Sequence, residues 1–162
     1  MIEHYVRNRR KQTRMGDEGL IKIVFDLEPD VWHGSATETM WAEPVGRTQF
    51  RLKNSPFFVF DISAEDIVSA AALGDLWRYK AVTHRGGHST YRIFAFKDAG
   101  GRFDDHWKSL SELGCSYEEG PVLAVDVPPR ADIYKVYSLL EAGEQANVWE
   151  FEEGHCGHPL KK

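Results

Sequence analysis

The segment Arg85–Arg92, with the sequence RGGHSTYR, divides the chain into two parts with different hydrophobic patterns. Its two adjacent glycines allow a sharp turn or a positive φ, and the polar residues after them lead into an apolar strand over residues 91–96. Polar groups at such a strand end lie at the rim of a sheet, where binding sites are common. The segment is therefore both a structural boundary and a candidate ligand site.

The part before this boundary predicts a run of short strands. The apolar and alternating stretches lie at residues 20–27, 37–43, 48–53, 66–71 and 77–82, about ten residues apart where Pro and Gly break them. The four apolar residues Phe57–Phe60 are expected to be largely buried. This spacing predicts a β-rich lobe over residues 19–89, folded as a small β-barrel or a curled antiparallel sheet.

The part after the boundary combines strands with helices. Strands are expected at residues 91–96, 121–127 and 148–152, with helices between them at residues 103–113, stopped by Gly114, and 132–143, capped by Asp132 and ended by Gly143. A β-α-β-α-β order predicts a ferredoxin-like lobe over residues 90–155 packed with the first lobe, and an α+β fold class. Residues 1–18 are expected to form a basic flexible arm and residues 156–162 a tail.

Charge is distributed unevenly along the chain. The net charge is −5, yet residues 1–14 carry five basic residues against one acidic residue, and from Asp98 onward thirteen acids face six bases. An acidic half argues against nucleic-acid binding, because phosphate contacts need clustered Lys and Arg. It favours association with a basic protein partner.

Cysteine use and hydropathy predict a cytoplasmic protein. Two cysteines, Cys115 and Cys156, are too few for a disulfide scaffold. The first residues lack the apolar core and cleavage site of a secretory signal, and no apolar run reaches the roughly 20 residues of a membrane helix. We expect no membrane association, and the sequence leaves the oligomeric state open.

Several short segments together resemble a bacterial family described only as a domain of unknown function. They cover roughly residues 20–155. They are Phe25-Asp26-Leu27, Trp32-His33-Gly34, Met40-Trp41-Ala42-Glu43-Pro44, Asn54-Ser55-Pro56-Phe57-Phe58, Gly87-His88-Ser89-Thr90-Tyr91-Arg92, Leu113-Gly114-Cys115 and Val125-Asp126-Val127-Pro128-Pro129. The chain departs from the family pattern at Glu65-Asp66, where the resemblance implies Gly-Asp, and in its basic N-terminal extension. The resemblance implies no activity.

The candidate ligand site consists of His84, His88, Ser89, Thr90 and Arg92. Adjacent strand residues point to opposite faces, so His88 is not placed to act as a base for Ser89, and no Gly-x-Ser-x-Gly turn is present. The alternative is a purely structural rim turn in which Arg92 pairs with an acid such as Glu43 or Asp61.

Metal and cofactor binding are not predicted. His155, Cys156 and His158 are zinc-ligand types, but a closed site needs a further ligand from Cys115 or a distant histidine. Nucleotide-binding and dinucleotide-binding glycine motifs and the HExxH metalloprotease motif are absent from the sequence.

These observations favour a non-catalytic bacterial binding protein that acts through an acidic surface bearing aromatic residues. Its most concrete form is an immunity protein that neutralises a cognate toxin. The expected partner-binding residues are Trp107, Glu118, Glu119, Trp149, Glu152 and Glu153. The alternatives are a small-molecule-binding or regulatory domain with its ligand near His88, and an enzyme of unknown chemistry.

Overall fold

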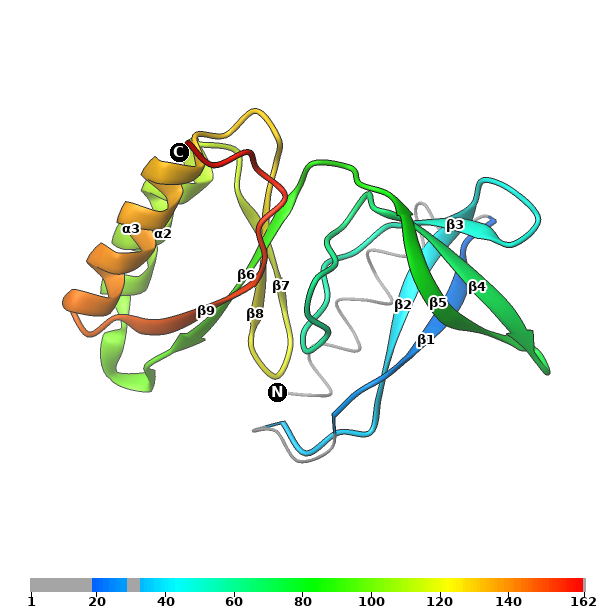
Figure 1. Ribbon diagram of the computed structural model, residues 1–162. Coiled ribbons are helices and arrows are strands. Elements are labelled where there is room, and N and C mark those ends of the chain that lie inside the picture. Colours follow the sequence, from blue (N-terminus) through cyan, green and yellow to red (C-terminus); the bar gives the residue numbers. More distant parts are fainter. Residues whose placement is uncertain (1–18, 29–32, 162) are drawn as a thin grey trace.

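The computed structural model describes residues 19–28 and 33–161, which form two sheets and two α-helices (Figure 1). Most of the regular structure is strand, as the sequence predicts. The arm expected at residues 1–18 lies outside the described residues.

The first lobe is built from five short strands. The strands are β1 (Ile21–Asp26), β2 (Thr37–Pro44), β3 (Gln49–Leu52), β4 (Ile67–Leu73) and β5 (Leu76–His84). Neighbours along the order β1-β2-β3-β4-β5 pair antiparallel, and β1 also pairs with β5 in parallel. The strand expectations for this part are met within a few residues.

Period-2 alternation supplies the core of the first lobe. Along β1, Ile23 and Phe25 are buried, and along β2 the buried positions are Glu38, Met40 and Ala42. Successive side chains point to opposite faces of a strand, so these residues share the inner face. One of them, Glu38, is charged.

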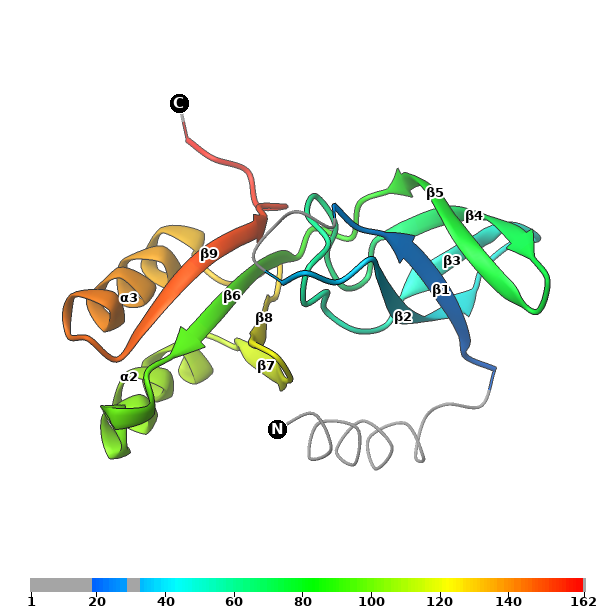
Figure 2. The ribbon, with the colours of Figure 1, turned by 90° about the horizontal axis from the view of Figure 1, so that it is seen from below.

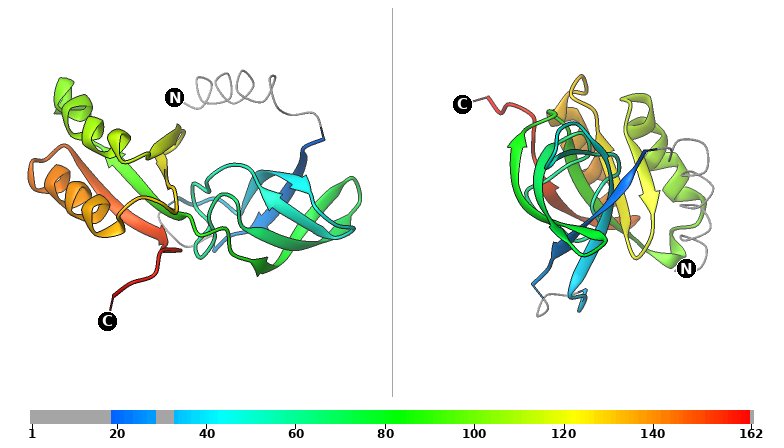
Figure 3. Two further views of the ribbon diagram at one scale, coloured as in Figure 1. Left: turned by 90° about the horizontal axis from the view of Figure 1, so that it is seen from above. Right: turned by 90° about the vertical axis from the view of Figure 1, so that its right-hand side faces the viewer.

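The second lobe contains one antiparallel sheet and both α-helices. Its elements are β6 (Ser89–Ala95), a short 3₁₀ helix (Lys97–Ala99), α2 (Gly101–Glu112), β7 (Ser116–Glu119), β8 (Leu123–Val127), α3 (Ile133–Gln145) and β9 (Trp149–His155). The sheet order is β7-β8-β6-β9. Both helices cover the face of this sheet that points away from the first lobe (Figures 2 and 3).

Helix α3 shows why this packing forms. The carboxylate of Asp132 accepts the backbone N–H groups of Tyr134 and Lys135, which caps the helix as predicted. Ile133, Val136 and Leu140 are buried along one side, at the spacing of an amphipathic helix.

The structure corrects three expectations for individual elements. Helix α3 continues through Gly143 to Gln145, and Gly143 contacts the indole of Trp149 instead of ending the helix. Strand β7 was not expected, because Ser116–Glu119 is short and polar. The expectation that Phe57–Phe60 are all largely buried is wrong for Phe60, whose side chain is 48% exposed.

Residues 53–66, which connect β3 to β4, lie between the two sheets (Figure 1). Phe57 packs with Val122 and Ala124 of the second lobe in a small core of its own. The backbone N–H of Asp61 donates to the carbonyl of Gly154 at 3.0 Å. We call this segment the connecting loop.

Among the described residues, no helix has both the length and the apolar character needed to cross a membrane.

We predict that Gly143→Ala destabilises the protein because a Cβ there would lie 2.2 Å from the Cε2 atom of buried Trp149. Overpacking a core typically costs about 1–3 kcal/mol of unfolding free energy. Urea unfolding should show this loss, whereas Gly101→Ala should change stability by less than about 0.5 kcal/mol, because a Cβ at Gly101 meets no atom within 4 Å. Equal stability of the two variants would contradict the close packing of α3 on β9.

Candidate functional site

A buried carboxylate from the first lobe holds the connecting loop. Glu38 is only 7% exposed, and its two oxygens accept the backbone N–H groups of three successive residues. Phe57 donates at 2.6 Å, and Phe58 and Val59 donate at 3.0 Å. A carboxylate removed from water needs such partners, and three peptide donors meet that need.

A buried guanidinium from the second lobe holds the same three-residue segment from the other side. Arg92 on β6 is fully buried and donates to the carbonyl oxygens of Val59 at 2.8 Å and Phe58 at 2.9 Å. Its Nε donates to Glu152 at 3.1 Å. Burial lowers the pKa of Arg92, and its hydrogen bond with Glu152 opposes that shift. The predicted pairing of Arg92 with a carboxylate is confirmed, but the carboxylate is Glu152, not Glu43 or Asp61.

The end of the connecting loop fixes the glycine turn before β6. Asp66 is fully buried and accepts the N–H groups of Ser63 and Gly86, together with a hydrogen bond from the Arg85 side chain. A Cβ on Gly86 would lie 2.6 Å from the Glu65 carbonyl oxygen, so only glycine fits this approach. The turn thereby positions His88.

His88 lines a polar cleft of about 160 Å³ between the lobes. Its Nδ1 lies 2.8 Å from a carboxylate oxygen of Asp126 on β8. Burial raises the pKa of Asp126, and the neighbouring His88 partly offsets that shift. The cleft is lined by Lys53, Asn54, Ser55, Ala64, Glu65, His88, Ser116, Tyr117, Glu118, Ala124 and Asp126.

Only His88, among the five predicted ligand-site residues, lies in this cleft. His84 is exposed at the end of β5, beside Thr83. The rim expectation is wrong for Ser89 and Thr90, which are fully buried: the Thr90 hydroxyl hydrogen-bonds that of Ser63. Arg92 instead donates hydrogen bonds to carbonyl oxygens of the connecting loop.

The Ser89 hydroxyl fastens the residues after β9 to the second lobe. Its Oγ lies 2.6 Å from Nδ1 of His158 and accepts the backbone N–H of Gly157. Nε2 of His158 lies 2.9 Å from the Pro128 carbonyl, which makes Nε2 the donor and leaves Nδ1 to accept the Ser89 proton. Because Ser89 and His158 are both buried, this Ser–His pair is a structural fastening.

Strand alternation separates the predicted partner-binding acids. On β7, Glu119 lies on the helix side of the sheet with Tyr117, whereas Glu118 lines the interlobe cleft. On β9, Glu152 pairs with buried Arg92, and exposed Glu153 accepts the hydroxyl of Tyr91. These four acids therefore do not form one patch.

The two predicted tryptophan anchors differ. Trp149 is fully buried, and its indole N–H donates to the Leu140 carbonyl, so the expectation that it contacts a partner is corrected. Trp107 is partly buried and packs edge-on against Tyr117, with ring centroids 4.7 Å apart, and parallel to Phe103.

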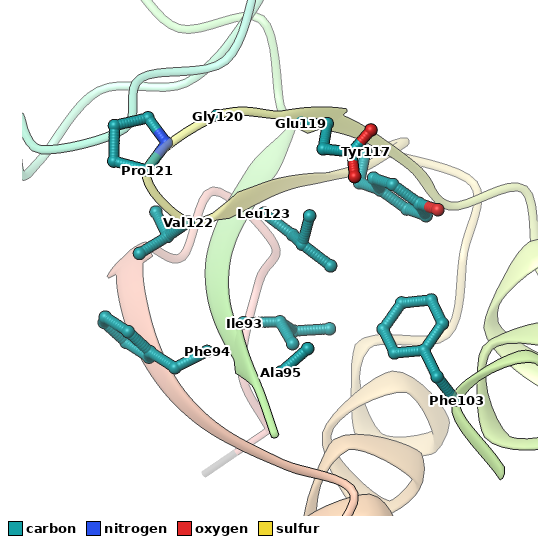
Figure 4. A pocket seen from close by; sticks show the side chains of 10 residues that line it. All are labelled: Ile93, Phe94, Ala95, Phe103, Tyr117, Glu119, Gly120, Pro121, Val122 and Leu123. Atoms are coloured by element: carbon teal, nitrogen blue, oxygen red, sulfur yellow. The ribbon is translucent and has the colours of Figure 1, made fainter. Parts of the chain in front are cut away.

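A larger, mostly apolar pocket of about 400 Å³ lies beside this aromatic group (Figure 4). Its walls come from the end of β6, the β7–β8 hairpin and the start of α2. The lining residues are Ile93, Phe94, Ala95, Phe103, Tyr117, Glu119, Gly120, Pro121, Val122 and Leu123. Glu119 supplies a carboxylate to this apolar pocket.

The described residues do not form a metal site. Within residues 19–28 and 33–161, no three His, Cys, Asp or Glu side chains are grouped closely enough to hold a metal ion. Cys156 lies near the carbonyl of His158, and burial raises the pKa of Cys115 to about 11.

Several structurally decisive residues were not predicted. Glu38 alternates with Met40 and Ala42 on β2, so its place on an apolar face was visible in the sequence. Asp126 sits in a similar way within an apolar strand. No sequence pattern indicates that Tyr117 lines the apolar pocket, because strand β7 is not expected from the sequence.

Comparison with known proteins places the chain in a family. The family described as a domain of unknown function (DUF4265) matches residues 38–151, which is most of the chain. The chain belongs to the DUF4265 family. The matched region spans the whole connecting loop and ends within β9.

A solved structure shares the fold of this DUF4265 chain. It is described as a novel crystal structure of a hypothetical protein from Neisseria gonorrhoeae. It is 17% identical, with a TM-score of 0.71, over 85% of this chain and 95% of that one. A search of curated proteins finds no match.

We predict that Arg92→Met strongly destabilises the protein, because it leaves two loop carbonyls and Glu152 without their donor. Removing one partner of a buried ion pair costs about 3–5 kcal/mol. The matched control is Arg78→Met, which breaks an exposed pair with Asp26 and should cost less than about 1 kcal/mol. Urea unfolding measures both, and similar losses would show that Arg92 does not hold the loop.

Proposed function

We propose that this protein is a non-catalytic binding protein whose helix-side face engages a basic protein partner. Its most concrete form is an immunity protein that neutralises a cognate toxin. The observation that carries the proposal is the apolar pocket of about 400 Å³, which has aromatic walls and the carboxylate of Glu119. Such a pocket accepts a protruding side chain with an apolar stem and a positive end.

The aromatic walls support this role because they are held rigidly. Phe103 lies parallel to Trp107 and edge-on to Tyr117, with ring centroids 6.4 Å and 6.0 Å apart. Phe103 also contacts buried Trp149 edge-on, which ties the pocket wall to the core. Rigid aromatic anchors lose little conformational entropy when a partner binds.

The electrostatics of the pocket favour a cation. The pKa of Tyr117 is raised, chiefly by burial and further by Glu119 and Asp104, so both carboxylates act on this part of the wall. A Lys or Arg of the partner can bury its aliphatic stem among the apolar side chains and pair its charge with Glu119. Exposed acids at the rim also speed the encounter with a basic partner.

The proposal retains two of the residues expected from sequence, Trp107 and Glu119. Glu118 lines the interlobe cleft instead, and Glu152 pairs with Arg92. Trp149 supports the pocket from inside the core. The exposed tyrosines Tyr134 and Tyr137 on α3 add aromatic surface on the same side of the second sheet.

We predict that filling the pocket abolishes partner binding while the fold is retained. Ala95→Phe places a ring at an exposed lining position, and the matched control Ala81→Phe places the same ring on exposed β5 of the first lobe. Wild type and both variants, immobilised on beads, are exposed to a lysate of the native host, and retained proteins are identified by mass spectrometry.

A partner held by wild type and Ala81→Phe but lost by Ala95→Phe would support the pocket. If the partner is a toxin, cells that express it should grow when they also express wild type or Ala81→Phe, but not when they express Ala95→Phe. Retention by all three proteins would place binding elsewhere.

We further predict that charge reversal near the pocket slows association more than it speeds dissociation. Glu119→Lys with Asp104→Lys should lower the association rate constant about tenfold at low salt and flatten its salt dependence. Glu28→Lys with Asp75→Lys is the control, since it makes the same charge change on exposed positions of the first lobe. If both pairs alter the rates equally, net charge alone is responsible, and the pocket acids have no special role.

A second candidate is a small-molecule-binding or regulatory function. The polar cleft beside His88 favours it, because sites of this kind often lie between lobes.

We also propose a finer description of the fold. Support for a ferredoxin-like second lobe is its element order β6-α2-β7-β8-α3-β9, with antiparallel neighbours in the order β7-β8-β6-β9. Support for a small β-barrel in the first lobe is the pairing of β1 with both β2 and β5.

A further inference from the structure

A mostly apolar groove of about 420 Å³ lies between α2 and α3. We call it the helix groove. The end of α2 and the start of α3, which contribute to its walls, lie at the same end of the helix layer (Figure 1). Its lining includes Glu112 and Leu113 from the end of α2, and Tyr134, Lys135, Ser138 and Leu139 from α3.

The helix groove is separate from the apolar pocket. Phe103, near the start of α2, lines the pocket, and Leu113, directly after the last residue of α2, lines the groove. About ten residues of α-helix span roughly 15 Å, so the two cavities lie toward opposite ends of this helix. They have no lining residue in common, and one can be occupied while the other is free.

The groove belongs to an exposed apolar surface. Tyr134 is 44% exposed, and its hydroxyl accepts the backbone N–H of Lys161, which brings the end of the chain to the groove. The neighbouring Leu160 is 63% exposed, and Leu113 and Leu139 are only partly buried. Covering such side chains removes apolar surface from water, which favours association.

The charges on the two sides of the groove have opposite signs. Glu112 is exposed on the α2 side, and Lys135 is exposed on the α3 side. The ion pairs that the described residues form all involve other side chains. Lys161 adds a positive charge on the α3 side, where its ammonium group lies 6.0 Å from the centre of the Tyr134 ring. One wall is therefore acidic and the other basic.

This arrangement decides between kinds of partner. A basic protein would meet Lys135 and Lys161, so the partner proposed for the apolar pocket matches this groove poorly. An anionic membrane surface attracts clusters of bases, and Glu112 would oppose it. A copy of the same surface matches both signs, because a twofold rotation brings the acidic side of one copy to the basic side of the other.

We infer that the helix groove is the contact surface of a twofold-symmetric homodimer, in which Glu112 of each copy pairs with Lys135 of the other. A contact between two different residues occurs twice in such an interface, so two ion pairs flank the apolar contact. The helix pairs of the two copies pack as a layer of four helices, with each Tyr134 ring against the other copy's groove. The short side chain of Ser138 permits this close approach.

The first test is the oligomeric state of the purified full-length chain, measured by analytical ultracentrifugation from micromolar to millimolar concentration. We expect a reversible monomer–dimer equilibrium that follows mass action. Ser138→Arg should abolish the dimer, because it places a long charged side chain in the groove at an exposed position. Ser111→Arg makes the same change on α2 outside the groove lining, and should leave the dimer dissociation constant within about twofold. Circular dichroism checks that both variants are folded.

Charge exchange tests the twofold arrangement itself. Glu112→Lys and Lys135→Glu each turn two attractive contacts into two repulsive ones, so each should weaken dimerisation about tenfold. The double variant Glu112→Lys/Lys135→Glu restores both pairs with their signs exchanged and should dimerise nearly as well as wild type. Glu144→Lys, at an exposed α3 position outside the groove lining, is the control for net charge.

Four results would overturn the inference: wild type stays monomeric at millimolar concentration, Ser138→Arg dimerises as Ser111→Arg does, the single charge variants behave like Glu144→Lys, or the double variant dimerises no better than they do. None of these results bears on the proposed partner binding, because the comparison of Ala95→Phe with Ala81→Phe changes no groove residue.

Discussion

Two opposite charges, Glu38 and Arg92, determine how the lobes are placed. They do not pair directly; the peptide groups of residues 57–59 lie between them, with N–H groups toward Glu38 and two carbonyls toward Arg92. Each charge leaves water because the backbone replaces its hydration. Since one charge belongs to β2 and the other to β6, the loop between them fixes the distance between the two sheets.

The same loop also shapes the interlobe cleft. The same loop that is held at residues 57–59 continues to Glu65 and Asp66, and Asp66 then sets the turn that carries His88. Lys53 and Asn54, at the start of the loop, form the facing wall. The cleft therefore lies where three segments far apart in sequence converge, held by buried charges.

Most strands and both helices could be predicted from sequence, because period-2 and helical alternation depend only on local sequence. Hydrogen-bond partners that lie far apart in the sequence could not be predicted. Glu38 stands on an apolar strand face, which signals a buried charge, but its acceptor role toward residues about twenty positions away has no local trace. The sequence pattern predicts Trp149 as a surface anchor, because a tryptophan at a strand start fits either a core or an interface. Its burial depends on the absence of a Cβ at Gly143, which looked like a helix end.

The two candidate sites use opposite faces of one sheet and share an edge. Strand β7 pairs with β8 and lies at the end of the order β7-β8-β6-β9. Its residue Tyr117 lines both the apolar pocket and the polar cleft. An edge strand with one paired side adjusts more readily than a central strand, because fewer ladder hydrogen bonds restrain it. Tyr117, on this edge strand, therefore belongs to the walls of both cavities.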